Sequence, residues 1–489
     1  MEISRRGLLA GALAAGSMDR SLAGYWPLRS DARDRSGRGL HGVRKITAER
    51  ESYVEVPHHP ALDFGAGDFS LCAWIHTEKD PRDVPGDILT KYDPVQRRGF
   101  NWSLQSSAGG YNSHGTDRQV LFGIDSGSAP GWEECGRPSP TSNYVSNSLT
   151  VFDGHLYAGT TDGATVADWC HVYRYAGGAR WEDCGRVGNL RTRGAGPLIV
   201  HDGALYAATW SYDWRRVATD RLDLCRVYRH GGGQSWEDCG QPGACRRLFG
   251  IASFRGRLYI TGDDNKCHVH EGGKSWRAVR EFPSLAHPML VHGGKLHIGA
   301  FAAIQLGGFK QAIVETFDGS EWASLGCPLG SAEHADQIHD LEVYHGKLHA
   351  TTWPTGKVAV FDGGRWVDCG RLGDSTEINA LAVYNGKLYA GTIPRAEVFR
   401  YEGGQEWRRI RRFFAPEGWE PIPVGANRGV PDGRKRMGEW TRVTSLTSYR
   451  GRLFAGIGSC TSSLEDAPAD IRLAARRPAG EGAALNGRA

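Results

Sequence analysis

The fold of this chain is indicated by a repeated stretch whose clearest copy, residues 172–185, reads VYRYAGGARWEDCG. Two runs of alternating apolar and polar side chains flank a pair of glycines, and the second run ends in Trp, two acidic residues, Cys and Gly. Alternation with a period of two around a glycine-bearing turn predicts a β-hairpin. The tryptophan of this unit recurs at Trp181, Trp236, Trp276, Trp322, Trp366 and Trp407.

A second repeated unit is a turn followed by Gly-x-Leu and then an aromatic residue or histidine. Its seven copies begin at Gly154, Gly203, Gly256, Gly294, Gly346, Gly386 and Gly451. This unit also predicts a hairpin. One hairpin of each kind makes a four-stranded sheet of about 40–50 residues, which is the size of a propeller blade.

The two counts differ, because seven Gly-x-Leu units are followed by only six tryptophan units. A seventh tryptophan unit, GWEECG at residues 131–136, precedes all of them. We therefore expect the segment around Trp132 to supply the outer strand of the last blade, since this closure pairs edges that would otherwise stay open. The sequence predicts an all-β chain in which residues 128–462 form a seven-bladed β-propeller with four-stranded blades. Its period is similar to that of Kelch-type propellers, whose signature is only partly matched.

The composition agrees with many short strands and argues against other classes. Glycine accounts for 67 of the 489 residues, about twice its roughly 7% average share. The 59 basic and 55 acidic residues nearly balance and form no long charged run, so no nucleic acid is implied as a partner. No stretch of 18 apolar residues occurs, so no transmembrane span is expected.

Residues 1–23 are interpreted as an export signal. Arg5 and Arg6 precede a short stretch of small and apolar residues, which resembles a twin-arginine signal. The alternative is a frayed helix at the start of the chain. An export signal predicts a periplasmic or extracellular location, where disulfides are permitted.

Residues 24–127 lack the repeat and contain alternating runs that suit a β-sandwich. DRSGRGLHG at residues 34–42 and FSLCAWI at 69–75 resemble the first half of the laminin-G/concanavalin A-like jelly roll of secreted bacterial proteins. Neither the Trp-His strand nor the Tyr-x-Asp-Gly hairpin of that family's second half is found. We interpret the propeller as inserted into this sandwich, whose second half is missing. Residues 463–489 are expected to be irregular, either through truncation or frameshift or as a native disordered tail.

Candidate ligand-binding residues gather where the chain enters each innermost strand, at the mouth of the predicted channel. Seven residues before each repeat glycine lie Asn147, Gly196, Phe249, His287, His339, Asn379 and Thr444. Nearby positions that suit an acidic ligand are Arg193, Arg247, Gln337, Glu377 and Arg442. The loops after the second strands add Trp169, Trp210, Asp213, Trp214 and Trp353. Aromatic rings beside polar groups suit a sugar. The alternatives are contacts to channel water or neighbouring loops, and packing between blades.

Support for catalysis or a metal is weaker. Glycoside hydrolysis needs two carboxylates about 5–10 Å apart, which the sequence does not identify, and the Asp boxes of sialidase propellers are matched only at their Gly and Trp end. No zinc-binding spacing occurs. The jelly-roll resemblance implies calcium as a cofactor, with Asp34, Asp63 and Asp68 as candidate ligands.

Two cysteine pairs are placed symmetrically about hairpin glycines. Cys170 and Cys184 are equidistant from Gly177, and Cys225 and Cys239 are equidistant from Gly232. Residues opposite each other across two strands lie within disulfide reach, so the sequence predicts two cross-strand disulfides. The alternative is that these cysteines are free thiols that pack in the buried core.

Together these observations predict an exported, non-catalytic protein that binds a carbohydrate or glycan. The first alternative is a sialidase- or lyase-like enzyme that acts on polysaccharide at the propeller mouth. The second is a protein-interaction scaffold outside the cytoplasm, because fold alone does not fix function.

Overall fold

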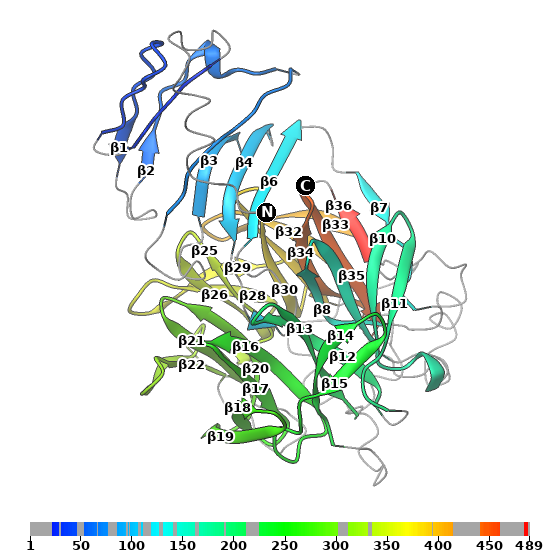
Figure 1. Ribbon diagram of the computed structural model, residues 1–489. Coiled ribbons are helices and arrows are strands. Elements are labelled where there is room, and N and C mark those ends of the chain that lie inside the picture. Colours follow the sequence, from blue (N-terminus) through cyan, green and yellow to red (C-terminus); the bar gives the residue numbers. More distant parts are fainter. Residues whose placement is uncertain are drawn as a thin grey trace. The chain divides into compact units, whose positions relative to one another are not determined.

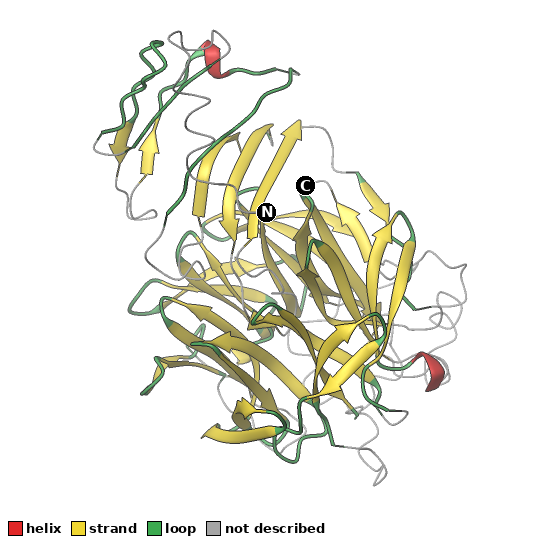
Figure 2. Cartoon of the chain, viewed as in Figure 1, coloured by secondary structure: helices red, strands yellow, loops and turns green. Residues whose placement is uncertain are grey.

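A computed structural model describes nearly all of the repeat region and parts of the rest. The described residues are 22–28, 31–45, 53–65, 67–76, 86–93, 96, 98–105, 109–110, 119–126, 131–139, 144–161, 166–189, 192–211, 224–301, 312–330, 335–393, 395–413, 441–459 and 484–487. They are almost entirely β-structure, with two short 3₁₀ turns, η1 (Pro60–Leu62) and η3 (Val166–Asp168) (Figure 2). The chain divides into two compact units, Met1–His76 and Thr77–Ala489.

The first unit contains a small antiparallel pair. β1 (Val43–Lys45) pairs with β2 (Tyr53–Glu55). Before it, the indole Nε1 of Trp26 donates a hydrogen bond to the carbonyl oxygen of Leu40 at 2.6 Å. The predicted domain of residues 24–127 is therefore divided between the two units, with its boundary at His76.

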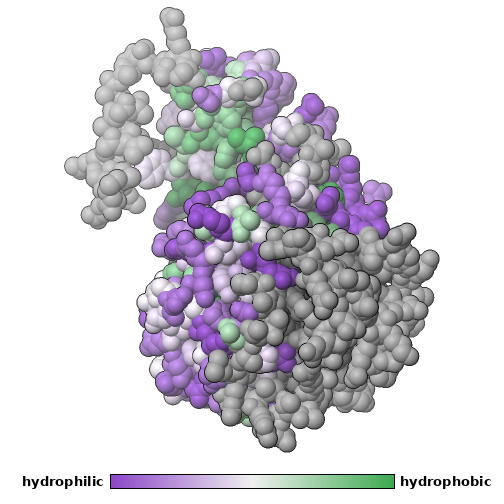
Figure 3. Space-filling view, turned by 90° about the vertical axis from the view of Figure 1, so that its right-hand side faces the viewer, coloured by the Kyte–Doolittle hydropathy of each residue, from purple (hydrophilic) through white to green (hydrophobic). Residues whose placement is uncertain are grey.

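The second unit begins with a three-stranded sheet of β3 (Gly86–Asp93), β4 (Arg98–Gln105) and β6 (Gln119–Ser126). Its two faces differ because side chains alternate along each strand. On one face Asn101, Ser103 and Asp125 are buried. On the other face Val120, Phe122 and Ile124 are 53%, 40% and 60% exposed. Figure 3 shows hydrophobic side chains gathered in a patch on the face that it draws.

The rest of the unit is a β-propeller of successive four-stranded antiparallel sheets (Figure 1). Each sheet is named here by its first strand. The strands of the β8, β12 and β16 sheets are β8 (Tyr144–Phe152), β9 (His155–Thr161), β10 (His171–Gly177) and β11 (Arg180–Arg186); β12 (Gly194–His201), β13 (Ala204–Trp210), β14 (Val227–Gly232) and β15 (Ser235–Asp238); β16 (Leu248–Phe254), β17 (Arg257–Gly262), β18 (Lys266–Gly272) and β19 (Ser275–Glu281).

The chain continues through three further sheets. The strands of the β20, β25 and β30 sheets are β20 (Leu285–His292), β21 (Lys295–Phe301), β22 (Ile313–Phe317) and β23 (Trp322–Gly326); β25 (Leu341–Tyr344), β26 (Lys347–Thr351), β28 (Lys357–Phe361) and β29 (Trp366–Arg371); β30 (Glu377–Tyr384), β31 (Lys387–Ile393), β32 (Glu397–Gly403) and β33 (Glu406–Arg412). A short pair, β24 (Ala335–Gln337) with β27 (Trp353–Pro354), forms a separate two-stranded sheet.

The last sheet combines the two ends of the propeller sequence. β34 (Thr441–Tyr449) pairs with β35 (Arg452–Ser459), which pairs with β36 (Ala484–Gly487), and β36 pairs in turn with β7 (Trp132–Glu134). Trp132 therefore lies in the outer strand of the last sheet, where the count of repeats places it. The four residues of β36 are a strand rather than the irregular structure expected for residues 463–489.

Neighbouring sheets pack face to face through their inner strands. The first strand of each sheet contacts the first strand of the next, and β34 contacts β8. The apolar cores lie between these neighbours; for example, Phe254 and Tyr259 of the β16 sheet share a buried cluster with Met289 and Ile298 of the β20 sheet. One further strand, β5 (Gly109–Gly110), pairs with the first strand β16.

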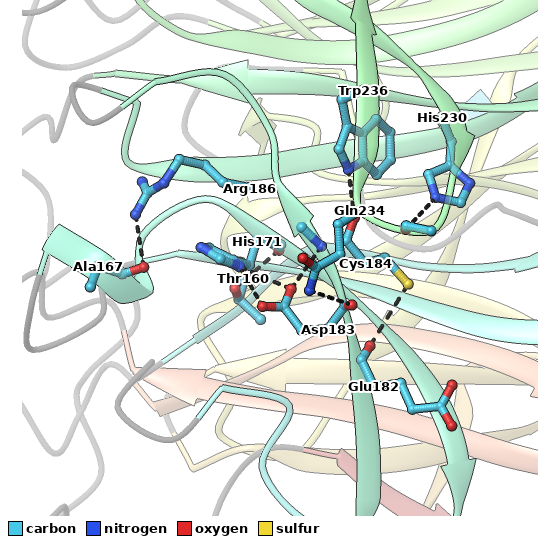
Figure 4. Close-up of polar contacts among 12 residues, drawn as sticks. Thr160, Ala167, His171, Glu182, Asp183, Cys184, Arg186, His230, Gln234 and Trp236 are labelled. Carbon is cyan, nitrogen blue, oxygen red and sulfur yellow. Dashed lines mark hydrogen bonds and ion pairs between the residues drawn. The ribbon is translucent and has the colours of Figure 1, made fainter.

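The Trp and the Cys-Gly pair that recur in the repeats of this chain have a direct structural role. The indole Nε1 of Trp236 donates a hydrogen bond to the carbonyl oxygen of Cys184 in the preceding sheet at 2.9 Å (Figure 4). A Cβ atom at the next residue, Gly185, would collide with the carbonyl oxygen of Gln234, and its φ of +92° is left-handed. Equivalent bonds join Trp181 to Cys135, Trp276 to Cys239, Trp366 to Leu325 and Trp407 to Cys369.

The predicted disulfides are wrong, because each hairpin turn is centred after the glycine from which the cysteines were counted: Gly177 pairs with Arg180, and Gly232 pairs with Ser235. The backbone N–H of Val187 bonds to Cys170, and that of Cys239 bonds to Val227, so neither cysteine pair lies opposite across its strands. All four thiols are free and buried. The Cys170 thiol instead donates to the carbonyl oxygen of Val187 at 2.9 Å.

Candidate functional site

A continuous cluster of polar and aromatic side chains lies where the innermost strands of several sheets begin. We call it the mouth cluster, and its members come from the ends of β13 and β24 and from the starts of β16, β20, β25, β30 and β34 or the residues just before them. They are Trp210, Arg247, Phe249, His287, Gln337, His339, Glu377, Asn379 and Arg442. Five of these nine positions were singled out at the same offset or among the aromatic loop residues, and the other four are Arg247, Gln337, Glu377 and Arg442, expected nearby.

One half of the mouth cluster combines a cation with aromatic rings. The guanidinium carbon of Arg247 lies 4.5 Å from the ring centre of Trp210 and 5.0 Å from that of Phe249. The rings of Phe249 and His287 are 4.1 Å apart, and those of His287 and His339 are 5.7 Å apart. Contacts of this kind hold a guanidinium in place without neutralising its charge.

The other half is a chain of polar contacts. The Nε2 atom of His339 lies 2.8 Å from Oε1 of Gln337 and 3.5 Å from Oε1 of Glu377. Arg442 lies 3.8 Å from the same Glu377 oxygen and donates a hydrogen bond to Oδ1 of Asn379 at 3.2 Å. The side chain of Glu377 is only 5% exposed, so its charge is balanced inside the cluster rather than by water.

Both histidines of the mouth cluster are neutral near pH 7. Burial lowers the pKa of His287 well below its ordinary value, and the neighbouring His339 and Arg247 lower it further. Burial also lowers the pKa of His339, although the Glu377 carboxylate opposes this shift. The charges of the cluster are then two arginines against one glutamate, which leaves a net positive mouth.

Arg193 extends this pattern to the β12 sheet. Its guanidinium carbon lies 4.7 Å from the ring centre of Trp169, and its backbone N–H donates to the carbonyl oxygen of Trp210 at 2.8 Å. Each of these two arginines therefore stacks on a tryptophan from the sheet that precedes it along the chain. The arginine–tryptophan pairing was not recognisable from the sequence, because the partners lie 24 and 37 positions apart.

The expected aromatic platform for sugar stacking is not formed by Trp210 or Trp353. Trp210 is 8% exposed and its indole Nε1 donates to the carbonyl oxygen of Gly196 at 2.8 Å, while Arg247 covers its ring. Trp353 is 4% exposed in the short strand β27. Asn147 lies in β8, and Asp213 and Trp214 fall outside the described residues.

The three aspartates predicted to bind calcium do not form a common site among the described residues. Asp34 accepts hydrogen bonds from the backbone of Tyr25, Ser36 and Leu40 and from the Ser36 hydroxyl. Burial alone would raise its pKa, but these bonds to the charged form lower the pKa of Asp34 to about 2. Asp63 is exposed and lies 3.6 Å from His58, and Asp68 is exposed. Asp34 thus organises its own loop.

A different set of metal-ligand types does converge in the β16 sheet. The thiol of Cys245, the carboxylate of Asp264 and the imidazole of His268 lie within 4.8 Å of one another, the one such group in the described part of the chain. The sequence offered no signal for it, since the spacing matches no common zinc motif.

Comparisons with known proteins give matches among solved structures. No family model matches the chain, and no curated protein matches it. The chain is similar to YCF48 bound to D1 peptide at 14% identity and a TM-score of 0.44, over 73% of this chain and 96% of that one. The WD40 repeats of RRP9 match at 14% identity and a TM-score of 0.44, over 74% and 98%. The computationally designed Ika8 protein matches at 13% and 0.41, over 67% and 84%.

The sequence predicts no transmembrane span, and the helices of the described residues can be compared with that prediction. Both are single 3₁₀ turns, and none of the helices in the described ranges is long and apolar enough to cross a bilayer.

Proposed function

We propose that this protein is an exported, non-catalytic glycan-binding β-propeller whose mouth cluster takes an acidic saccharide. The observation that carries the proposal is the pair of stacked arginines, Arg193 and Arg247, beside the Arg442–Asn379 contact. Guanidinium groups suit carboxylate or sulfate groups, because their planar N–H donors match such anions. Arginines fixed on aromatic rings lose little freedom when a ligand binds.

The neutral hydrogen-bonding groups of the cluster suit the hydroxyls of a sugar. The Nδ2 atom of Asn379 is buried and has no hydrogen-bond partner among the described residues. Gln337 is half-buried beside His339. Groups of this kind set the orientation and specificity of a polar ligand, while the arginines supply the attraction.

The number of carboxylates in the mouth cluster supports a non-catalytic function. Within the described residues the mouth cluster holds one carboxylate, Glu377, and that group is engaged by His339 and Arg442. A glycoside hydrolase of the usual kind needs two carboxylates that flank the scissile bond. The enzymatic alternative therefore has less support than binding.

At the level of fold we propose a seven-bladed propeller closed by β7. The support is the cycle of contacts among first strands, which returns from β34 to β8, and the pairing of β36 with β7. We also propose that β3, β4 and β6 belong to a half-sandwich of the laminin-G/concanavalin A-like type. A sandwich covers the apolar face of one sheet with a second sheet, and the exposed face of β6 is of that kind.

A glycan array tests the proposed function directly. The full chain is applied to immobilised neutral, carboxylated and sulfated oligosaccharides beside an Arg247→Gln variant and a matched Arg277→Gln control. Arg277 is an exposed arginine of β19 that pairs with Glu271 outside the mouth cluster. We expect binding to acidic glycans, lost in Arg247→Gln and kept in the control. Absence of binding to any acidic glycan, or equal binding by both variants, would overturn the proposal, and turnover of a bound glycan would favour the enzyme.

A further inference from the structure

The group of Cys245, Asp264 and His268 brings together three segments of the β16 sheet. Cys245 precedes the first strand β16, Asp264 lies in the turn between β17 and β18, and His268 lies in β18. Their ligand atoms are all within 4.8 Å of one another. The Nε2 atom of His268 lies 2.8 Å from Oδ2 of Asp264.

The group is largely shielded from water. Cys245 is fully buried and His268 is 3% exposed, while the Asp264 side chain is 19% exposed. The other carboxylate oxygen, Oδ1, accepts a hydrogen bond from the backbone N–H of Lys266 at 3.1 Å, which fixes the orientation of the carboxylate. One side of the group thus stays open to exchange with solvent through Asp264.

Two glycines leave the space around the group clear. A Cβ atom at Gly243 would collide with Oδ2 of Asp264 and the imidazole of His268. A Cβ atom at Gly262 would collide with the sulfur of Cys245. At both positions the backbone itself therefore lies against the ligand atoms. A residue with a side chain at Gly243 or Gly262 would displace a ligand atom.

We propose that Cys245, Asp264 and His268 form a Zn²⁺ site with three protein ligands. Zinc binds thiolate sulfur at about 2.3 Å, imidazole nitrogen at about 2.0–2.1 Å and carboxylate oxygen at about 2.0–2.2 Å, usually in a tetrahedron. Three donors bound at these lengths lie within about 4 Å of one another, so only small movements of the side chains are needed. Soft sulfur with imidazole selects zinc over calcium and magnesium, which prefer oxygen.

The remaining coordination position is assigned to water. The neighbouring Asp263 is already used, since its Oδ1 accepts from the backbone N–H of Arg246 at 2.9 Å, and the described residues supply no further ligand. A water molecule completes a tetrahedron in sites with three protein ligands. The bound ion ties the segment before β16 to the β17–β18 turn, and none of its three ligands belongs to the mouth cluster.

Metal binding is measured on the full, reduced chain with Zn²⁺ and with Co²⁺ as a spectroscopic probe. We expect one ion per chain after desalting, and a near-ultraviolet thiolate-to-Co²⁺ charge-transfer band that Zn²⁺ abolishes. Thermal unfolding of the unaltered chain should shift upwards with added Zn²⁺, because binding to the folded state alone stabilises it. This measurement needs no variant.

Variants then assign the ligands. Cys245→Ser should lose the charge-transfer band, and Asp264→Asn and His268→Gln should each weaken metal binding at least tenfold. Cys184→Ser, which changes a buried thiol of the β8 sheet, should keep the band. Circular dichroism shows whether each variant is folded. The proposal is overturned if the unaltered chain gives no charge-transfer band, or if the band persists in folded Cys245→Ser.

Discussion

The indole Nε1 of Trp181 donates a hydrogen bond to the carbonyl oxygen of Cys135 at 2.7 Å. Trp181 lies in β11 of the β8 sheet, and Cys135 directly follows β7, the outer strand of the β34 sheet. This bond therefore joins the propeller sheet that comes first along the chain, the β8 sheet, to the propeller sheet that comes last, the β34 sheet. It repeats the contact that links Trp236 to Cys184 between sequential sheets.

Replacing Trp181 by phenylalanine tests this link. Trp181→Phe keeps an aromatic ring beside Tyr175 but removes the N–H donor, so the buried carbonyl of Cys135 loses its partner. The expected loss is about 1–3 kcal/mol of unfolding free energy, measured by chemical denaturation. The matched control is Trp322→Phe, since the described residues give the Trp322 indole no backbone acceptor. Equal losses in the two variants would contradict the role of the bond.

Two glycines of the β8 sheet test the close approach between sheets. Gly185 and Gly178 both have left-handed φ angles, +92° and +58°, but only Gly185 faces a backbone oxygen of the next sheet. Gly178→Ala should cost about 1–2 kcal/mol from the backbone conformation alone. Gly185→Ala should cost clearly more, because the added carbon also pushes the Gln234 carbonyl away. The comparison is made by thermal unfolding, and similar melting temperatures would refute the close approach.

Buried histidines should make the protein less stable in mild acid. Burial lowers the pKa of His297 and of His349 to about 4, below the value of about 6.5 expected in the unfolded chain. The unfolded state therefore binds more protons as the pH falls from about 6.5 to 4, and stability is lost across that window. Each histidine contributes about 1.4 kcal/mol per pH unit in the middle of the window.

Denaturation at pH 7.0 and 5.5 checks this slope. His349→Gln should reduce the loss of stability between the two pH values, whereas a change at the exposed His76 should leave it as in the unaltered chain. A protein equally stable at both values would show that the histidines are not buried as described.

The thiols of the predicted disulfide pairs should all be free. Cys170, Cys184, Cys225 and Cys239 are buried, and burial raises the pKa of Cys184 to about 11 and that of Cys225 to about 12. Their reaction with alkylating reagents should be slow in the folded protein and complete after denaturation without reductant. Peptide mapping that finds either pair joined would contradict the hairpin registers.

The hairpins could be predicted from the sequence, but their registers could not. Gly178 and Ala179 form the turn between β10 and β11, where the alternating runs predict a turn, and Gly177 is the last residue of β10. Counting equal distances from Gly177 nevertheless failed to pair Cys170 with Cys184, because the turn is centred between Gly178 and Ala179, so Cys170 lies opposite Val187. The loop residues fix the register of a hairpin, and two adjacent glycines do not specify which residues form that loop.

The mouth cluster could be predicted in part. Counting back from each repeat glycine located His287 and His339, whose rings are in contact, because equivalent positions of successive sheets lie side by side. The burial of Trp210 beneath Arg247 was missed, since a tryptophan at the end of a strand gives no sign of which side chain covers it. The group of Cys245, Asp264 and His268 was missed because three separate segments supply it.

The arginines of the mouth cluster are proposed to bind an acidic saccharide. Isothermal titration of the full chain with the best acidic oligosaccharide from the array tests it most directly, with Arg247→Gln and Arg277→Gln as the compared variants. We expect at least tenfold weaker binding for Arg247→Gln, equivalent to about 1.4 kcal/mol, weaker binding at higher salt, and unchanged binding for Arg277→Gln. Unaltered affinity in Arg247→Gln, or affinity that is lost equally in both variants, would contradict it.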